Sequence, residues 1–275
     1  GLGDVYKRQV QYRLPTPGSE IFASFSKGYK AGGYNTQMFS DVLQQKVMET
    51  MGLSAKYDVS TIISYAPEKS WNYEIGCRLS TADRKLSGEM ALFYIDCRDQ
   101  QLTMFPEGTT TGRIMANAGK TRSVGAEISG RWRPASQWMI RASYGFTSAE
   151  FVDFDNGRED YAGRRVPYVP QNTFFAGVSW NRPLSRSLSI EINVGLRGVG
   201  SIYWDEANRY RQPFYALLDA SAAVSGRRWS VTLGGDNLTA TRYATFSYES
   251  IGNRFVQRGK PARGTVTFRY EISTF

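Results

Sequence analysis

The side chains that could do chemistry in this chain are arginines, tyrosines and carboxylates, because its 275 residues include no histidine and only two cysteines. The lack of histidine excludes His-dependent catalytic triads, histidine metal clusters and most general-base schemes. It also argues against haem capture by an imidazole. We therefore predict that the chain is not an enzyme and that it holds neither a metal nor a cofactor.

The two cysteines, Cys77 and Cys97, are predicted to stay unpaired. They lie on neighbouring strands of a predicted hairpin, where they are about eight residues out of register, roughly 26 Å at the rise of a strand. A disulfide cannot bridge that separation. Neither their spacing nor their neighbours indicate a metal site.

Charged residues recur at alternate positions of the predicted strands. In residues 188–196, for example, Leu, Ile and Val alternate with Ser, Glu191, Asn193 and Gly, a pattern typical of a strand between lipid and a wet lumen. We predict eight lumen-facing residues of this kind: Glu74, Arg78, Glu127, Arg131, Arg141, Glu191, Arg197 and Asp219. They are interpreted either as a wall of mutually paired, solvated side chains or as contacts for a plug or a moving cargo.

About ten such strands can be read along the chain, with boundaries good to about two to four residues. The predicted strands are 20–28, 70–80, 86–97, 122–133, 137–149, 173–182, 187–200, 214–225, 229–237 and 263–272. The connections between them alternate long and short. In a barrel of sequential antiparallel strands, this alternation puts short periplasmic turns at one rim and long external loops at the other.

The opposite faces of these strands are apolar and rich in aromatic residues, as expected of a lipid-facing girdle. The lipid-facing aromatic residues are predicted to be Trp71, Tyr73, Trp132, Trp138, Tyr144 and Trp180. The fold class is therefore all-β: a transmembrane, antiparallel, up-and-down β-barrel. No run of about 18 apolar residues suggests a membrane-spanning helix.

The formal net charge is +9, which raises the question of nucleic acid. The Lys and Arg residues are scattered rather than clustered, so we do not expect nucleic-acid binding. Residues 1–19 are interpreted as a leader, whose opening is interpreted as a scar of cloning or assembly, and 20–275 as the barrel domain. Because no signal peptide precedes the strands, we expect either a processed chain or a fragment.

Four segments, in this order, together resemble the C-terminal barrel of TonB-dependent outer-membrane receptors. They are Phe22–Asn35, Pro67–Gly76, Asn117–Gly119 with Gly125–Glu127, and Asp236–Leu238 with Arg242–Tyr243. In these motifs Gly28, Gly32 and Gly33 are expected to allow positive φ at a rim turn. Asn237 is expected to end a strand with an Asx turn.

The resemblance implies active import across the outer membrane of a Gram-negative bacterium. The family has roughly 22 strands around an N-terminal plug, so we expect about ten C-terminal strands of a larger barrel, with the plug absent. The implied partners are outer-membrane lipid, lipopolysaccharide, the plug and the TonB complex, and a small-molecule cargo such as a ferric siderophore. One departure is that Phe275 has the wrong parity for the lipid-facing aromatic residue that ends such proteins.

A ferric siderophore is often anionic and aromatic, so arginines and tyrosines of the long loops are the expected contacts. The candidates are Tyr34, Arg164, Arg165, Tyr203, Trp204, Arg209, Arg211, Arg254 and Arg258. Their alternative role is loop packing and lipopolysaccharide contact. Haem, cobalamin, nickel chelates and glycans stay open as cargo. A complete ten-strand passive channel and a soluble all-β binding module are the alternative functions.

Overall fold

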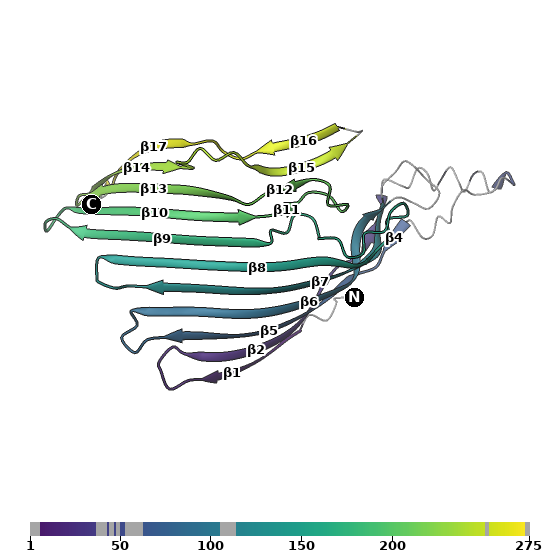
Figure 1. Ribbon diagram of the computed structural model, residues 1–275, viewed down its shortest axis with the longest axis horizontal. Helices are drawn as coiled ribbons and strands as arrows, with labels where there is room; N and C mark the ends of the chain where they lie inside the picture. Colours follow the sequence, from purple (N-terminus) through teal and green to yellow (C-terminus); the bar gives the residue numbers. More distant parts are fainter. Residues whose placement is uncertain are drawn as a thin grey trace.

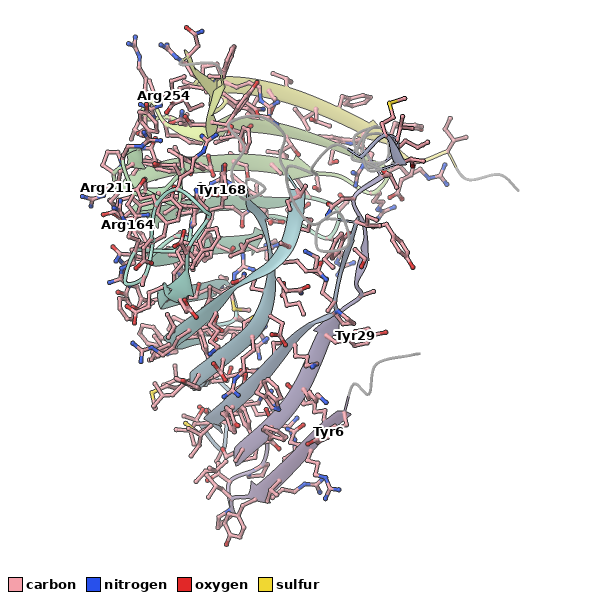
Figure 2. The ribbon with its side chains drawn as sticks, turned by 90° about the vertical axis from the view of Figure 1, so that its right-hand side faces the viewer. Tyr6, Tyr29, Arg164, Tyr168, Arg211 and Arg254 are labelled. Atoms are coloured by element: carbon pink, nitrogen blue, oxygen red, sulfur yellow. The ribbon has the colours of Figure 1, made fainter. Side chains whose placement is uncertain are left out.

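The computed structural model describes residues 6–36, 43, 47, 50–52, 63–104, 114–250 and 253–272. Eleven of its strands form one sheet, in the order β1-β2-β5-β6-β7-β8-β9-β10-β13-β14-β17. The strands of this sheet follow one another in chain order, and the strands that fall between them belong to separate small hairpins. The sheet is strongly curved (Figures 1 and 2). β1 and β17 form its two edges, so the described residues form an open wall rather than a closed barrel.

The strands of the wall are β1 (Tyr6–Arg13), β2 (Glu20–Lys30), β5 (Glu68–Ser80), β6 (Leu86–Met104), β7 (Ile114–Trp132), β8 (Trp138–Phe154), β9 (Asn172–Pro183), β10 (Ser189–Gly200), β13 (Tyr215–Ser225), β14 (Trp229–Asp236) and β17 (Arg263–Tyr270). The remaining strands form three small hairpins: β3 (Gly33–Tyr34) with β4 (Ser64–Tyr65), β11 (Ile202–Tyr203) with β12 (Arg211–Gln212), and β15 (Ala244–Ser250) with β16 (Asn253–Arg258).

Ten strands of the wall are those that the sequence predicts, and β1 is an addition. It pairs with β2 from Tyr6 opposite Lys27 to Arg13 opposite Glu20, inside the segment interpreted as a leader. The alternation of Val10 and Tyr12 with polar residues is too short to predict a strand, and only the partner strand fixes it. Residues 1–5 and Phe275 lie outside the described residues.

The connections sort by length as predicted, with short turns at one end of the strands and long ones at the other (Figure 1). One predicted connection, 98–121, is largely wrong, because β6 continues to Met104 and β7 begins at Ile114. The pairing of these two strands shifts between Cys97 and Gln101. A bulge breaks the two-residue period, so the sequence pattern ends before the strand does.

Cross-strand register places the eight predicted lumen residues on one face of the sheet. One row runs from Ser87 through Arg131, Arg141, Gly177 and Gly195 to Asp219. The opposite face carries exposed apolar side chains, among them Tyr73, Trp132, Trp138 and Tyr144. This is the division between a polar face and a lipid-facing one that the alternation predicts.

Glycines at the rim serve close approach rather than the positive φ that we expected. Gly28, Gly32 and Gly33 are not among the described glycines with positive φ. A Cβ on Gly32 would lie 2.3 Å from the carbonyl oxygen of Tyr65, and one on Gly33 would lie 2.4 Å from the Tyr65 hydroxyl. These glycines therefore let the β4 segment pack directly against the chain that leaves β2.

The two cysteines are free, as predicted. Cys77 lies opposite Met90 on β6, and Cys97 lies opposite Ser70 on β5, so the two thiols are well separated along the hairpin. Within the described residues, no helix is both long and apolar enough to cross a membrane.

Candidate functional site

Three long connections gather at one end of the wall, and we call them loops A, B and C. Loop A (155–171) joins β8 to β9, loop B (201–214) joins β10 to β13, and loop C (237–262) joins β14 to β17. Eight of the nine predicted cargo residues belong to these loops. Figure 2 shows Arg164, Arg211, Arg254 and Tyr168 along the part of the rim that these loops form.

Loops A and B are joined by paired backbone and side-chain hydrogen bonds. The N–H of Arg165 donates to Asn208 Oδ1 over 2.7 Å, and Asn208 Nδ2 donates to the Arg165 carbonyl over 2.9 Å. The guanidinium of Arg164 donates to the carbonyl of Ala207. Beneath these contacts lies a buried apolar cluster that includes Phe151, Phe154, Tyr161 and Ala207. Loop A is therefore held to loop B by both polar and apolar contacts.

Loops B and C are joined by ion pairs and ring contacts. Tyr210 donates its hydroxyl proton to Glu249 over 2.9 Å, and Arg209 lies 3.5 Å from the same carboxylate. The guanidinium of Arg254 lies 4.6 Å from the centre of the Tyr210 ring. A second buried cluster contains Ile202, Trp204 and Ala244, while the Trp204 indole N–H has no hydrogen-bond partner among the described residues.

Tyr168 is the residue at which all three loops meet. Its ring stacks on Phe246 of loop C, with centroids 5.6 Å apart and planes 14° apart, and packs at 5.6 Å against Trp204 of loop B. Its backbone N–H donates to the carbonyl of Tyr203, and its own φ is +64°. A tyrosine rarely adopts that φ, so the surrounding contacts hold it there.

The sequence analysis missed Tyr168 as a site residue. A usable signal was present, since Pro167-Tyr-Val-Pro170 fixes an aromatic ring between two prolines. The stacking of Tyr168 on Phe246, 78 positions further along the chain, could not be read from the sequence. Asn237 follows the end of β14 as predicted, with a φ of +49°. Its Oδ1 accepts the N–H of Thr241, four residues on, whereas the predicted Asx turn would close on the N–H two residues on.

Most of the predicted cargo residues also serve loop packing. Arg164 pairs with Glu159 at 2.8 Å, Arg209 pairs with Asp205 at 3.2 Å, and Trp204 is 5% exposed. Three further arginines donate to serine hydroxyls: Arg165 to Ser148, Arg211 to Ser201 over 2.5 Å, and Arg254 to Ser247 over 3.0 Å. The guanidinium of Arg211 also lies 6.0 Å from the centre of the Tyr203 ring.

Two predicted cargo residues are placed differently. Arg258 is exposed at the end of β16 and has no ion pair among the described residues. Tyr34 is 68% exposed in β3 and belongs to the connection between β2 and β5 rather than to the three loops. The structure therefore leaves Arg258 the freest arginine of the candidate set.

The loops carry an excess of positive charge that is concentrated in loop C. Loop C contains Arg242, Arg254, Arg258 and Lys260 against the single carboxylate Glu249. In loops A and B the cations and carboxylates are equal in number. An anionic ligand would accordingly be drawn to loop C.

Two pKa values reflect these contacts. The hydrogen bond to Glu249 is the main reason that the pKa of Tyr210 is raised, and the hydrogen bond with Asp205 is the main reason that the pKa of Arg209 is raised. Both groups therefore keep their protons at any physiological pH. The loops can offer hydrogen-bond donors, positive charge and aromatic faces, which is chemistry for binding. The described residues contain no group of side chains suited to a metal ion.

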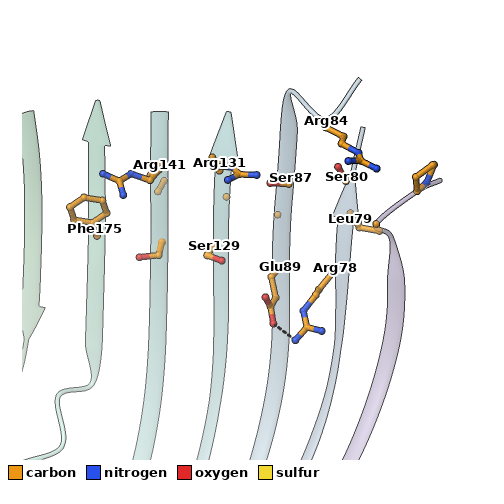
Figure 3. Close-up of a pocket in the computed structure, with 16 residues that line it drawn as sticks. Arg78, Leu79, Ser80, Arg84, Ser87, Glu89, Ser129, Arg131, Arg141 and Phe175 are labelled. Atoms are coloured by element: carbon orange, nitrogen blue, oxygen red, sulfur yellow. Dashed lines mark hydrogen bonds and ion pairs between the residues drawn. The ribbon is translucent and has the colours of Figure 1, made fainter. Parts of the chain in front are cut away.

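A second polar feature lies on the lumen face near the short turns. It is a hollow of about 590 Å³ lined by Arg78, Arg84, Arg131 and Arg141, with Glu89 as its carboxylate (Figure 3). Arg78 pairs with Glu89 at 3.3 Å and also with Glu20 at 2.6 Å on β2. The hollow is therefore basic overall.

The rest of the lumen face is only partly paired. Arg197 pairs with Asp219 at 3.3 Å, and Glu191 accepts a hydrogen bond from Asn193. Arg131 lies directly opposite Arg141 with no ion pair for either among the described residues, and their guanidinium groups point away from each other (Figure 3). No ion pair is formed by Glu74 or Glu127 within the same residues. These four residues thus form no ion pair among the described residues, and the choice between a solvated wall and contact with a plug or a moving cargo stays a prediction.

Comparison with known proteins is consistent with this geometry. The family description "TonB dependent receptor-like, beta-barrel" matches residues 2–238. The pesticin receptor of Yersinia enterocolitica is 34% identical over 230 residues, which are 83% of this chain and 30% of that receptor. The ferrichrome outer membrane transporter/phage receptor of Escherichia coli K12 is 26% identical over 220 residues, which are 75% of this chain and 27% of that protein.

Solved structures show the same arrangement of strands. The ferric yersiniabactin uptake receptor of Yersinia pestis superimposes with a TM-score of 0.77 at 26% identity, over 98% of this chain and 37% of that one. The siderophore receptor PiuA of Acinetobacter baumannii gives a TM-score of 0.71 at 18% identity, over 97% of this chain and 35% of that one. The chain thus spans about 30% of the length of the curated relatives that it matches first.

Proposed function

This chain belongs to the TonB-dependent receptor-like β-barrel family, and from that membership we propose that it supplies barrel wall and external ligand-binding loops to an importer of ferric siderophores. Such receptors lie in the outer membrane of Gram-negative bacteria, and the exposed aromatic face of the sheet suits that place. Coupling to TonB is assigned to a plug domain elsewhere in the receptor.

The observation that supports this proposal best is the gathering of arginines and tyrosines where loops A, B and C meet. Arg254 and Arg258 on β16, with Arg211 and Tyr203 on the hairpin of loop B, offer charge and ring faces at one rim. An anionic, aromatic iron chelate needs those two kinds of contact. Similarity to receptors named for ferric siderophores points to the same class of cargo.

The test measures the binding of ferric yersiniabactin and of ferrichrome to the full-length gene product through the quenching of its intrinsic fluorescence. We choose the double variant R211Q/R258Q, because Arg209 is held by two carboxylates and its loss would also disturb the packing of the loops. Each charge-assisted contact is worth about 1.5–3 kcal/mol, so the loss of two is expected to weaken binding by about a hundredfold or more.

A matched control removes two cations from the other end of the wall, R13Q/R269Q, and should bind as the unmodified receptor does. If neither chelate binds the unmodified receptor, the cargo proposal is wrong. If a chelate binds and R211Q/R258Q holds it equally well, the assignment of these residues is wrong.

A second candidate function is docking of a protein ligand on the β15–β16 hairpin. Phe246, Tyr248 and Phe255 form a row of rings on one face of this hairpin, with neighbouring centroids 5.6 and 5.1 Å apart, and each ring is more than 40% exposed. Aromatic rows of this kind are frequent at protein interfaces. Pesticin, for which the Yersinia relative is named, is the probe: F255S should weaken its binding, and equal binding would count against this role.

A further inference from the structure

The short-turn end of the wall carries a charge pattern that the import function does not use. The turns 14–19, 81–85, 133–137, 184–188 and 226–228 hold six cations and one carboxylate, Asp83. The cations are Arg84, Lys85, Arg133, Arg186, Arg227 and Arg228, and all six are exposed. We call this set the turn cations.

The turn cations are almost entirely unpaired. Lys85 lies 3.7 Å from Asp83, and none of the five arginines forms an ion pair with any described carboxylate. Two further acidic residues lie at this end: Glu20, which pairs with Arg78, and Glu271, whose backbone N–H donates to the carbonyl of Arg228. By contrast, ion pairs hold Arg164, Arg209 and Arg263 at the loop end.

Tryptophans fix the depth of these cations relative to the membrane. Four of the six tryptophans lie on the lipid-facing side next to the short turns: Trp132, Trp138, Trp180 and Trp229. The Trp138 and Trp180 rings lie 6.3 Å apart across β8 and β9. Tryptophan settles at the level of the lipid headgroups, so this belt marks the membrane interface.

The turn cations lie just beyond that belt, toward water. Arg133 follows Trp132 directly, and Arg227 and Arg228 directly precede Trp229. Arg182 shares the strand and the parity of Trp180, and so it lies on the lipid-facing side two residues further out. One to three residues of extended chain reach about 3–10 Å, which is comparable to the thickness of the headgroup layer on one side of a bilayer, about 5–8 Å.

We infer that the turn cations, apart from Arg84 at the lumen hollow, bind the headgroups of anionic phospholipids in the periplasmic leaflet of the outer membrane. Unpaired arginines at headgroup depth match phosphate in charge and in geometry, because guanidinium binds phosphate through two parallel hydrogen bonds. The neighbouring tryptophans hold the same lipid chains. This surface is separate from the cargo loops, so the inference stands whichever cargo those loops take.

The test is lipid selectivity of the full-length gene product in vesicles of phosphatidylcholine with added phosphatidylglycerol. Brominated phosphatidylglycerol quenches tryptophan only on contact, so quenching at the Trp132–Trp229 belt reports the preference of this rim for the anionic lipid. We expect a clear preference in the unmodified receptor. In R227Q/R228Q it should fall roughly fivefold to twentyfold, since each cation near an anionic surface is worth roughly fivefold.

The matched control, R242Q/K260Q, removes two cations from loop C and should keep the full preference. Retention of the compact barrel in cold detergent shows that each variant is folded. If a variant does not fold, the inference can still be tested with the unmodified receptor by changing the salt concentration. Raising the salt from about 0.05 M to about 0.5 M should abolish an electrostatic preference for the anionic headgroup. Equal quenching by brominated phosphatidylcholine and phosphatidylglycerol, or a preference that survives in R227Q/R228Q, would overturn the inference.

Discussion

Replacing Tyr168 by alanine should release loops A, B and C from one another while leaving the wall intact. The change removes the stacking of Tyr168 on Phe246 and its packing on Trp204. Each aromatic pair contributes about 0.5–1.5 kcal/mol, so the free energy that holds the loops together should fall by about 1–3 kcal/mol. The population of opened loops would then rise about fivefold to about 150-fold.

Limited trypsin digestion of the folded full-length receptor measures that population. The bonds after Arg164 and Arg165 lie in loop A and are protected by its contacts with loop B. When opening and closing are faster than cleavage, the cleavage rate follows the open population. Tyr168→Ala should therefore speed cleavage in loop A by the same factor, without changing the melting temperature of the barrel.

Two variants make the result specific to the rings. Tyr168→Phe keeps both ring contacts and loses only a 3.4 Å hydrogen bond to the Ser247 carbonyl, so its cleavage rate should stay within about twofold of the unmodified receptor. Tyr34→Ala removes an exposed tyrosine from another connection and should have no effect on loop A. The role of Tyr168 in holding the three loops together would be refuted if Tyr168→Ala were cleaved no faster than the unmodified receptor. It would also be refuted if Tyr168→Phe were cleaved as fast as Tyr168→Ala.

The remaining predictions concern the wall and the pH range of the loops. Gly125→Ala should destabilise the barrel by about 1–3 kcal/mol, because the new Cβ would lie 2.2 Å from the Phe93 ring. Gly130→Ala on the same strand should be tolerated, because its new Cβ would lie 3.8 Å from the nearest heavy atom. Urea unfolding of the two variants compares their free energies of unfolding. The pKa of Tyr210 is raised, so its hydrogen bond to Glu249 stabilises the contact between the loops at every pH below the ordinary tyrosine pKa. That stabilisation is lost as the pH rises through the raised pKa. The absorbance difference at the tyrosinate band between the unmodified receptor and Tyr210→Phe follows this step, and a midpoint at or below the ordinary tyrosine range would contradict it.

The sequence by itself determined the wall. Alternation of apolar and polar residues fixed ten strands and their faces, because a shift of one residue would exchange lipid-facing and polar side chains. It also predicted the sorting of long and short connections and the separation of Cys77 from Cys97. These features depend on neighbours in the chain or on the next strand, which a local pattern can report.

Only the tertiary structure decided what the residues of the site do. β1 is defined as a strand by its pairing with β2. A bulge interrupts the sequence pattern, so the pairing of β6 and β7 beyond Cys97 could not be predicted. The glycines Gly32 and Gly33 are required by the approach of Tyr65, and Tyr168 is held by rings from two other loops. Contacts between residues tens of positions apart carry no period in the sequence, so the position of each loop side chain is settled by packing between the loops.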